Sequence, residues 1–320
     1  MKRINKILYL LLKSIMNPKK FFLVLNKRLF SIPNLNSLDG IKNTFLKEKY
    51  YFFWINLAKK NNKLKKYFFE NQKEQSQIYF DFNDKKNFEL NFSNSLAKNG
   101  VVCITNILPK DENIKIQKDF FDLRNYNDQN KNLSNWLIKP TKTISKTKVR
   151  VYSKKDLSNY ASLNRISNLI SKKITGKSLK SEAEFFLDSC IKLPEEKILG
   201  DNILHVDRFV PCFKIIYSPF DIEIDEAPFA YLPKSHKINK YHKDMILNRH
   251  YQNIQNSTYN EIKNQTIQMT IKKNTLVVFL ANGFHARTPF LGLKNRMLVF
   301  LQYNNSFNLI SLLNYKKFNS

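Results

Sequence analysis

The segment Leu204-His205-Val206-Asp207 carries two side chains that can bind a metal, two residues apart. Its alternation of apolar and polar residues predicts a half-buried β-strand. Residues i and i+2 of a strand point to the same face, so His205 and Asp207 are expected to direct an imidazole nitrogen and a carboxylate oxygen at one point. The segment therefore predicts two metal ligands on one face of a sheet.

A third ligand is expected from residues 279–285, which read Phe-Leu-Ala-Asn-Gly-Phe-His. We interpret these residues as a buried strand that ends in His285. If this strand lies beside the first one, two histidines and one carboxylate occupy one face of an octahedral metal and leave three positions open. That ligand set is typical of non-haem Fe(II) oxygenases.

Basic residues near these segments are candidate contacts for a carboxylate. Arg296 follows His285 by eleven residues, and the turn-like residues 288–295 predict a short hairpin that returns Arg296 close to His285. A guanidinium there would bind the far carboxylate of a 2-oxoglutarate co-substrate bidentately. Arg287 points the same way as His285 if the strand continues, which makes it a candidate contact for an anionic substrate or co-substrate.

Lys214 is a further candidate whose face the spacing leaves open. Regular alternation from His205 places Lys214 on the opposite face, whereas Pro211 predicts a bulge that would reset the alternation. Lys214 is therefore a possible second contact for the carboxylate. The alternative for both Lys214 and Arg287 is an ordinary surface charge.

The rest of the chain predicts a mainly β fold with flanking helices. A strand is expected at 101–104, helices over 109–123 and 159–174, and no regular element over the basic residues 138–155. After Gly176, a helix stop, the apolar residues come in short runs at 185–187, 213–217, 229–232, 275–280 and 297–303. Short strands after a helical start indicate a β-sandwich or jelly roll with helices packed outside it.

Several segments carry a resemblance to a known family: residues 99–104 with Leu108-Pro109, His205-x-Asp207, residues 227–236, and residues 274–280 with His285 and Arg296. Over roughly residues 90–305 the chain resembles the phytanoyl-CoA dioxygenase-like Fe(II)/2-oxoglutarate-dependent oxygenases. Lys234 stands where that family has the Gly of its Pro-Gly-Ser-His motif. His236, at the end of this motif, is expected to fix the loop that follows Pro233; the alternative is a contact with substrate.

The resemblance implies a double-stranded β-helix (jelly roll, cupin-like) with iron at its mouth. His205, Asp207 and His285 would hold Fe(II), Arg296 would hold 2-oxoglutarate, and O2 would take the remaining position. The implied reaction hydroxylates a C–H bond of a small organic substrate and decarboxylates 2-oxoglutarate to succinate.

The chain of 320 residues carries 54 Lys and Arg against 26 Asp and Glu, a net charge of +28. Such a charge alone favours nucleic acid, an anionic membrane or an acidic substrate. However, 45 of the basic residues are Lys and only nine are Arg. An excess of Lys with frequent Asn and Ile is typical of AT-rich coding, and proteins that read phosphates and bases favour Arg. Nucleic-acid binding is therefore not expected.

The three cysteines, Cys103, Cys190 and Cys212, are odd in number, far apart and set in apolar segments. This pattern predicts buried free thiols in a reducing compartment. We therefore expect a cytoplasmic protein.

We expect a basic, mostly helical N-terminal extension over residues 1–88, with a polar linker at 71–86, and an oxygenase domain over residues 89–320. Residues 1–30 hold eight Lys and Arg, no acidic residue, and apolar runs at 7–12 and 21–25. These runs are far shorter than the roughly 20 residues of a spanning helix. The segment either makes peripheral contact with an anionic membrane or packs on the main domain.

Two other functions remain open at this point. One is a jelly-roll binding protein that keeps the ligand motif without catalysis, and the other is a basic protein that binds nucleic acid or membrane surfaces. Residues 237–265 are polar and are either solvated or form a lid over the site. The sequence identifies neither the substrate nor the oligomeric state.

Overall fold

The computed structural model describes residues 59–60, 65, 77–129, 143–144, 149–154, 157, 159–176, 181–188, 204–207, 213–226, 228–237, 261–287 and 296–303. Nearly all of the expected N-terminal extension, including residues 1–30, lies outside this part of the chain. The same is true of residues 238–260, which make up most of the candidate lid.

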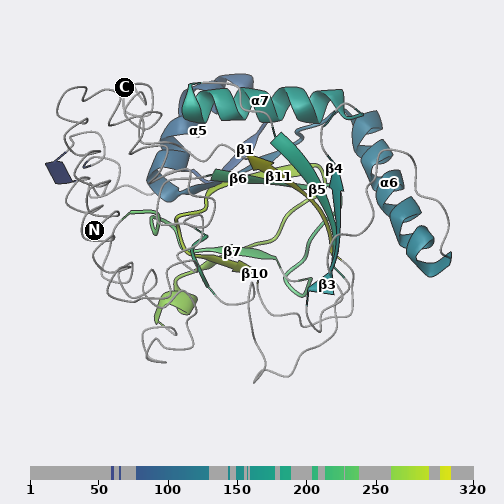
Figure 1. Ribbon diagram of the computed structural model, residues 1–320. Helices are drawn as coiled ribbons and strands as arrows, with labels where there is room; N and C mark the ends of the chain where they lie inside the picture. Colours follow the sequence, from purple (N-terminus) through teal and green to yellow (C-terminus); the bar gives the residue numbers. More distant parts are fainter. Residues whose placement is uncertain are drawn as a thin grey trace, which may run out of the picture.

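A large sheet forms the centre of the molecule (Figure 1). Its strand order is β1-β2-β9-β6-β11-β5-β4-β3, and only the β1–β2 pair is parallel. The strands are β1 (Tyr79–Asp81), β2 (Val101–Thr105), β3 (Thr143–Ile144), β4 (Val149–Lys154), β5 (Ser181–Asp188), β6 (Phe213–Ser218), β9 (Thr275–Leu280) and β11 (Arg296–Tyr303).

A second, smaller sheet has the order β10-β7-β8, with β7 (Phe229–Tyr231), β8 (Ile267–Met269) and β10 (His285–Arg287). An isolated antiparallel bridge joins His205 to His285 at the outer side of β10. From β5 onward the chain therefore passes repeatedly from one sheet to the other: large at β5, small at His205, large at β6, small at β7 and β8, large at β9, small at β10, and large at β11.

The core lies between the two sheets. Its buried side chains come from both of them, and the cluster comprises Ile78, Val101, Cys103, Ile216, Ile222, Phe229, Tyr231, Met269, Ile271, Val277, Phe279, Ala281 and Leu298. Burial of β-branched and aromatic side chains on facing strands is the main force that holds two sheets together. This packing fixes the strand ends that carry the site described below.

Helices cover the other face of the large sheet (Figure 1). Helix α5 (Lys85–Asn99) buries Phe88, Phe92 and Leu96, begins at the capping carboxylate of Asp84, and ends at Gly100 in the left-handed conformation with φ of 80°. Glycine is favoured there because it has no Cβ.

Helices α6 (Lys110–Gln129) and α7 (Ala161–Thr175) are joined by polar contacts. The Glu112 carboxylate accepts hydrogen bonds from the backbone nitrogens of Ser162 and Leu163, at 3.0 and 2.9 Å. It thereby caps the first turn of α7, whose own N-cap residue, Tyr160, makes no side-chain cap.

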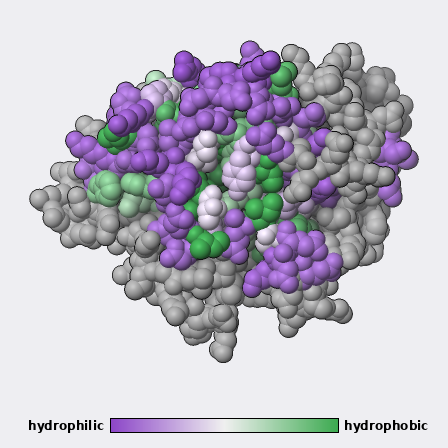
Figure 2. Space-filling model, turned by 180° about the vertical axis from the view of Figure 1, so that it is seen from behind, coloured by the Kyte–Doolittle hydropathy of each residue, from purple (hydrophilic) through white to green (hydrophobic). Residues whose placement is uncertain are grey.

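Seen from behind, the described surface is mostly hydrophilic, with hydrophobic side chains gathered near its middle (Figure 2).

The predicted mainly β fold with flanking helices is confirmed, but two local predictions are wrong. Strand β1 lies inside the expected linker 71–86, and strands β3 and β4 lie inside the segment 138–155, for which no regular element is expected from the sequence. Strands β1 and β3 are the two edges of the large sheet. Edge strands are short and tolerate charged residues, so their sequences carry a weak strand signal.

The domain boundary expected after residue 88 falls inside the continuous helix α5. Since β1 pairs with β2, the sheet begins before that residue. Among the described residues, no helix is long and apolar enough to cross a membrane.

Candidate metal centre

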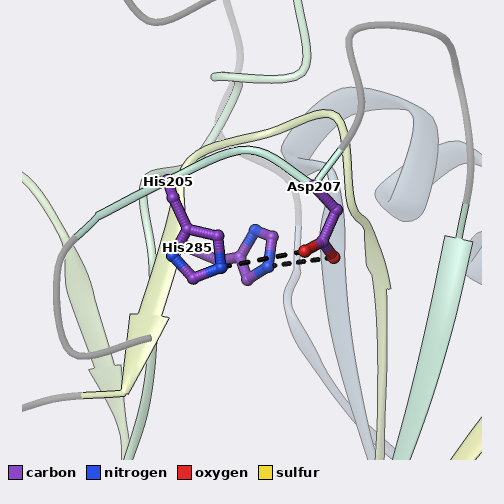
Figure 3. A group of neighbouring side chains, drawn as sticks. All are labelled: His205, Asp207 and His285. Carbon is purple, nitrogen blue, oxygen red and sulfur yellow. Dashed lines mark ion pairs between the residues drawn. The ribbon is translucent and has the colours of Figure 1, made fainter. Parts of the chain in front are cut away.

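His205, Asp207 and His285 converge on one point (Figure 3). One ligand atom from each lies within 4.8 Å of the other two. Nε2 of His285 is 3.3 Å from Oδ2 of Asp207, and Nε2 of His205 is 3.7 Å from Oδ1. The three residues that the sequence predicts as ligands are thus brought together.

Backbone pairing produces this convergence. The amide of each histidine donates to the carbonyl of the other, both at 2.9 Å, and the amide of Asp207 donates to the carbonyl of Ala281 at 3.0 Å. Residues directly opposite each other in an antiparallel pair project from the same side of the sheet. The imidazole rings of His205 and His285 accordingly lie 4.6 Å apart between centroids.

The strand predicted over 279–285 is wrong in one respect. Strand β9 ends at Leu280, the chain turns at residues 281–283, and His285 begins β10 in the other sheet. The expected hairpin to Arg296 is also wrong, because β10 pairs with β7 whereas β11 pairs with β5 and β6. The turn at Asn282-Gly283 is the physical reason, since this dipeptide favours a chain reversal.

A hydrogen bond from Nδ1 of His285 to the backbone fixes the orientation of its ring. Nδ1 lies 2.9 Å from the carbonyl oxygen of Gly283 and must carry the hydrogen that this bond requires. Nε2 is therefore the ring nitrogen that faces Asp207, where it is placed to bind a metal. A histidine ligand oriented in this way by a backbone carbonyl is the usual arrangement at protein metal sites.

The turn that carries Gly283 is held by a buried set of polar contacts from β7 and the residues after it. The hydroxyl of Tyr231 donates to the carbonyl of Leu280 at 3.0 Å, and the hydroxyl of Ser235 accepts from the amide of Phe284 at 2.7 Å. A Cβ atom on Gly283 would lie 2.0 Å from the Tyr231 hydroxyl. No motif in the sequence indicates that Tyr231 and Ser235 support the His285 ligand.

His236 fixes the loop that follows Pro233, as predicted. Its Nε2 donates to the carbonyl of Ala97 at 2.9 Å, and its own carbonyl accepts from the Asn282 side chain at 3.0 Å. Lys234 adopts φ of 65°, and its amide donates to the carbonyl of Asn99. A left-handed backbone favours glycine, which is the residue that the phytanoyl-CoA dioxygenase-like family has at this position.

Charge at the centre is dominated by Asp207 and Lys214. Nζ of Lys214 lies 2.7 Å from Oδ2 of Asp207. Burial alone would raise the pKa of Asp207, but the Lys214 ammonium, and then His285 and His205, hold that pKa well below its usual value. The carboxylate is therefore ionised throughout the physiological pH range, as a metal ligand must be.

The surroundings of the centre are apolar on one side and open on the other. The His285 side chain is 7% exposed and packs against the rings of Phe279 and Phe229, at 5.0 and 5.9 Å between centroids. His205 and Asp207 are 21% and 23% exposed. Two imidazole nitrogens and a carboxylate at these separations suit a borderline cation such as iron or zinc.

The other candidate residues, Lys214, Arg287 and Arg296, lie on three different strands. Lys214, at the start of β6, reaches the centre and contacts Asp207, although regular alternation from His205 places it on the opposite face. Arg287 is the last residue of β10, partly exposed and paired with Phe229. Arg296 is the first residue of β11 and pairs with Asp188, and its side chain lies outside the described part of the chain.

No family model matches the chain, and no curated protein matches it either. Similar solved structures include the epimerase SnoN in complex with Fe3+, alpha ketoglutarate and nogalamycin RO (10% identity, TM-score 0.46, covering 68% of this chain and 83% of that one). Two others are HygX from Streptomyces hygroscopicus with nickel and 2-oxoglutarate bound (13%, 0.42, 64% and 82%) and EctD from S. alaskensis with bound Fe (13%, 0.44, 66% and 75%). Similarity of this degree carries no conclusion about what this chain binds.

Proposed function

We propose that this chain is an Fe(II)- and 2-oxoglutarate-dependent oxygenase that hydroxylates a C–H bond of a small organic substrate. The observation that carries the proposal is the convergence of His205, Asp207 and His285, with Nε2 of His285 facing the shared point while Nδ1 is held by the Gly283 carbonyl. Two histidines and one carboxylate on one face of an octahedral metal leave room for a co-substrate and O2.

Each residue of the centre has a distinct part in this proposal. Iron bound there would supply the activation of O2 that is coupled to decarboxylation of 2-oxoglutarate to succinate. His205 and His285 hold their rings in place through the backbone bridge, and Asp207 contributes the negative charge that favours a divalent cation. Phe229 and Phe279 pack against the His285 ring and shield it from water.

Arg296 is proposed as the partner of the far carboxylate of 2-oxoglutarate. It precedes by two residues Leu298, which belongs to the core between the sheets, and its strand lies beside β6, the strand of Lys214. Arg287 is proposed as a contact for an anionic substrate, because it follows His285 by two residues on β10.

The proposed architecture is a double-stranded β-helix of the jelly-roll, cupin-like class. Its support is the path of the chain from β5 to β11, which passes from one sheet to the other at almost every step. Such a path places the 205–207 segment and β10 side by side at one end of the sandwich. Finer assignment to the phytanoyl-CoA dioxygenase-like family rests on the sequence resemblance alone.

The test is metal-dependent turnover combined with ligand removal. Purified protein with Fe(II), 2-oxoglutarate and O2 should form succinate, faster with a true substrate. His205→Ala, Asp207→Ala and His285→Ala should each abolish Fe(II) binding measured anaerobically and leave the circular dichroism spectrum unchanged. Stoichiometric Fe(II) binding that survives in all three variants contradicts the assignment.

The non-catalytic alternative makes a different prediction in the same experiment. A binding protein would take up Fe(II) and 2-oxoglutarate without forming succinate under any condition. We also propose a cytoplasmic location with peripheral membrane contact through residues 1–30, supported by their eight basic residues and two short apolar runs.

A further inference from the structure

One oxygen of the candidate ligand Asp207 is also the partner of a lysine. Its Oδ2 lies 2.7 Å from Nζ of Lys214 and 3.3 Å from Nε2 of His285. This oxygen atom is shielded from solvent. The Lys214 side chain is only 31% exposed, so water screens the ion pair less than it screens a surface pair. Lys214 thus supplies a full positive charge at the edge of the proposed metal position.

A divalent cation and this ammonium compete for the same carboxylate. A metal held by Asp207 and the two histidines lies about 2.0–2.2 Å from each nitrogen or oxygen ligand. It would therefore lie only a few ångström from Nζ of Lys214, and two positive charges at that separation repel each other strongly. His205 and His285 are fixed by the backbone bridge, whereas lysine has a flexible four-carbon stem. Lys214 is the group that can move.

We propose that Lys214 is the built-in counter-cation of this centre: it neutralises Asp207 in the metal-free protein, and an incoming divalent cation displaces it. This inference rests on the proposed metal centre. The displaced ammonium remains tethered to β6 beside the metal, where it favours the carboxylate of an anionic co-substrate. Binding of metal and binding of that anion then favour each other, because linkage between two sites is reciprocal.

A different role for Lys214 predicts the opposite effect of its removal. If Lys214 only held Asp207 in its ligating orientation, in the metal-bound as well as the metal-free protein, its loss would weaken metal binding. As a displaced counter-cation, its loss strengthens metal binding, because the metal no longer has a competitor. The sign of the change in metal affinity therefore separates the two roles.

The experiment measures Mn2+ affinity by calorimetry on the metal-free, full-length protein. Lys214→Met should bind Mn2+ more tightly by on the order of tenfold, a change within the range over which neighbours of metal ligands tune affinity. Lys214→Arg keeps the charge and should bind Mn2+ as the wild type does. Lys272→Met is the matched control, because Lys272 pairs with Glu223 on the surface and its side chain is 75% exposed.

Thermal unfolding gives a second readout that does not depend on activity. Metal-free Lys214→Met should melt at a lower temperature than the wild type, because Asp207 loses its strongest partner, and saturating Mn2+ should raise its melting temperature by more. If this variant does not fold, Lys214→Gln, which keeps a hydrogen-bond donor without the charge, should show the same increase in affinity.

The outcomes separate this inference from the proposed function. Mn2+ affinity that is unchanged or lower in Lys214→Met and Lys214→Gln overturns the inference, while metal binding by the wild type leaves the proposed metal centre standing. An increase that Lys272→Met reproduces also overturns it, since the effect would then come from net charge. A wild-type protein that binds neither Mn2+ nor Fe(II) overturns both proposals.

Discussion

Replacing Gly283 by alanine tests whether the turn before His285 is the support on which the metal centre depends. A Cβ atom at this position would lie 2.0 Å from Oη and 2.7 Å from Cζ of Tyr231, and 3.0 Å from Oγ of Ser235. The two contacts with Tyr231 are too short to be tolerated, and Ser235 would also have to shift slightly, so either the Tyr231 ring or the turn must move. Both movements disturb the carbonyl of Gly283 that orients the His285 ring.

The expected loss of stability follows from these contacts. Overpacking a filled site costs about 1–3 kcal/mol. The hydrogen bonds from Tyr231 to Leu280 and from Phe284 to Ser235 are each worth about 0.5–1.5 kcal/mol. Alanine recovers a little by restricting the unfolded chain. We expect Gly283→Ala to lower the free energy of unfolding by about 2–4 kcal/mol.

Urea unfolding and Mn2+ calorimetry provide the two measurements. Metal affinity should fall tenfold or more, the usual consequence of disturbing the partner of a histidine ligand. Gly176→Ala is the control, because Gly176 has φ of 74° but a Cβ atom added to it would meet no described atom within 4 Å. It should cost about 1 kcal/mol of backbone strain and leave metal affinity unchanged. The reasoning is refuted if Gly283→Ala costs no more than Gly176→Ala and binds Mn2+ normally.

Other parts of the molecule lead to four more expected outcomes. Arg296→Ala should raise the 2-oxoglutarate concentration needed for turnover by tenfold or more, because a charge-assisted contact is worth about 1.5–3 kcal/mol; an unaltered requirement, with Mn2+ affinity unchanged, would move this contact to Lys214 or Arg287. Glu112→Ala should lower the free energy of unfolding in urea by about 1–2 kcal/mol, because it uncaps α7, and an unchanged urea midpoint would show that the cap is dispensable. Cys103 should resist iodoacetamide at pH 8 in the native protein, because burial raises the pKa of its thiol to about 12; mass spectrometry that finds it alkylated before unfolding would contradict this. Deleting residues 1–30 should abolish binding to anionic vesicles at an unchanged melting temperature, since each lysine near such a surface contributes about 1 kcal/mol; a large drop in melting temperature, with no vesicle binding by the full chain, would indicate packing on the domain.

The convergence of His205 and Asp207 is predictable because it depends on a local rule. Residues i and i+2 of an extended chain share a face, and this holds for His205 and Asp207 even though, within the described residues 204–207, pairing is limited to the bridge at His205. The break before His285 has a signal in the sequence too, since Asn282-Gly283 is a strong turn dipeptide. The apolar run ahead of it favours a continuous strand, and in the folded chain the turn prevails.

Other features of the site depend on segments that are far apart in the chain. Ser235 and Phe284 are joined across 49 residues, and no pattern in either segment specifies the partner. The contact between Lys214 and Asp207 joins residues only seven apart, but alternation from His205 alone does not predict it. The edge strands β1 and β3 escape prediction because a strand paired on one side needs few apolar residues.

The bridge between His205 and His285 also bears on the local stability of the small sheet. In the part of the chain that the structure describes, the 204–207 segment pairs with β10 on one side only, and an unaccompanied edge of this kind opens readily in thermal fluctuations. A metal bound to both histidines would hold the 204–207 segment and β10 together. At a free metal concentration of one hundred times the dissociation constant, the paired form gains about 2.7 kcal/mol over the opened form. The exchange of the His205 and His285 amide hydrogens with solvent would therefore slow roughly a hundredfold.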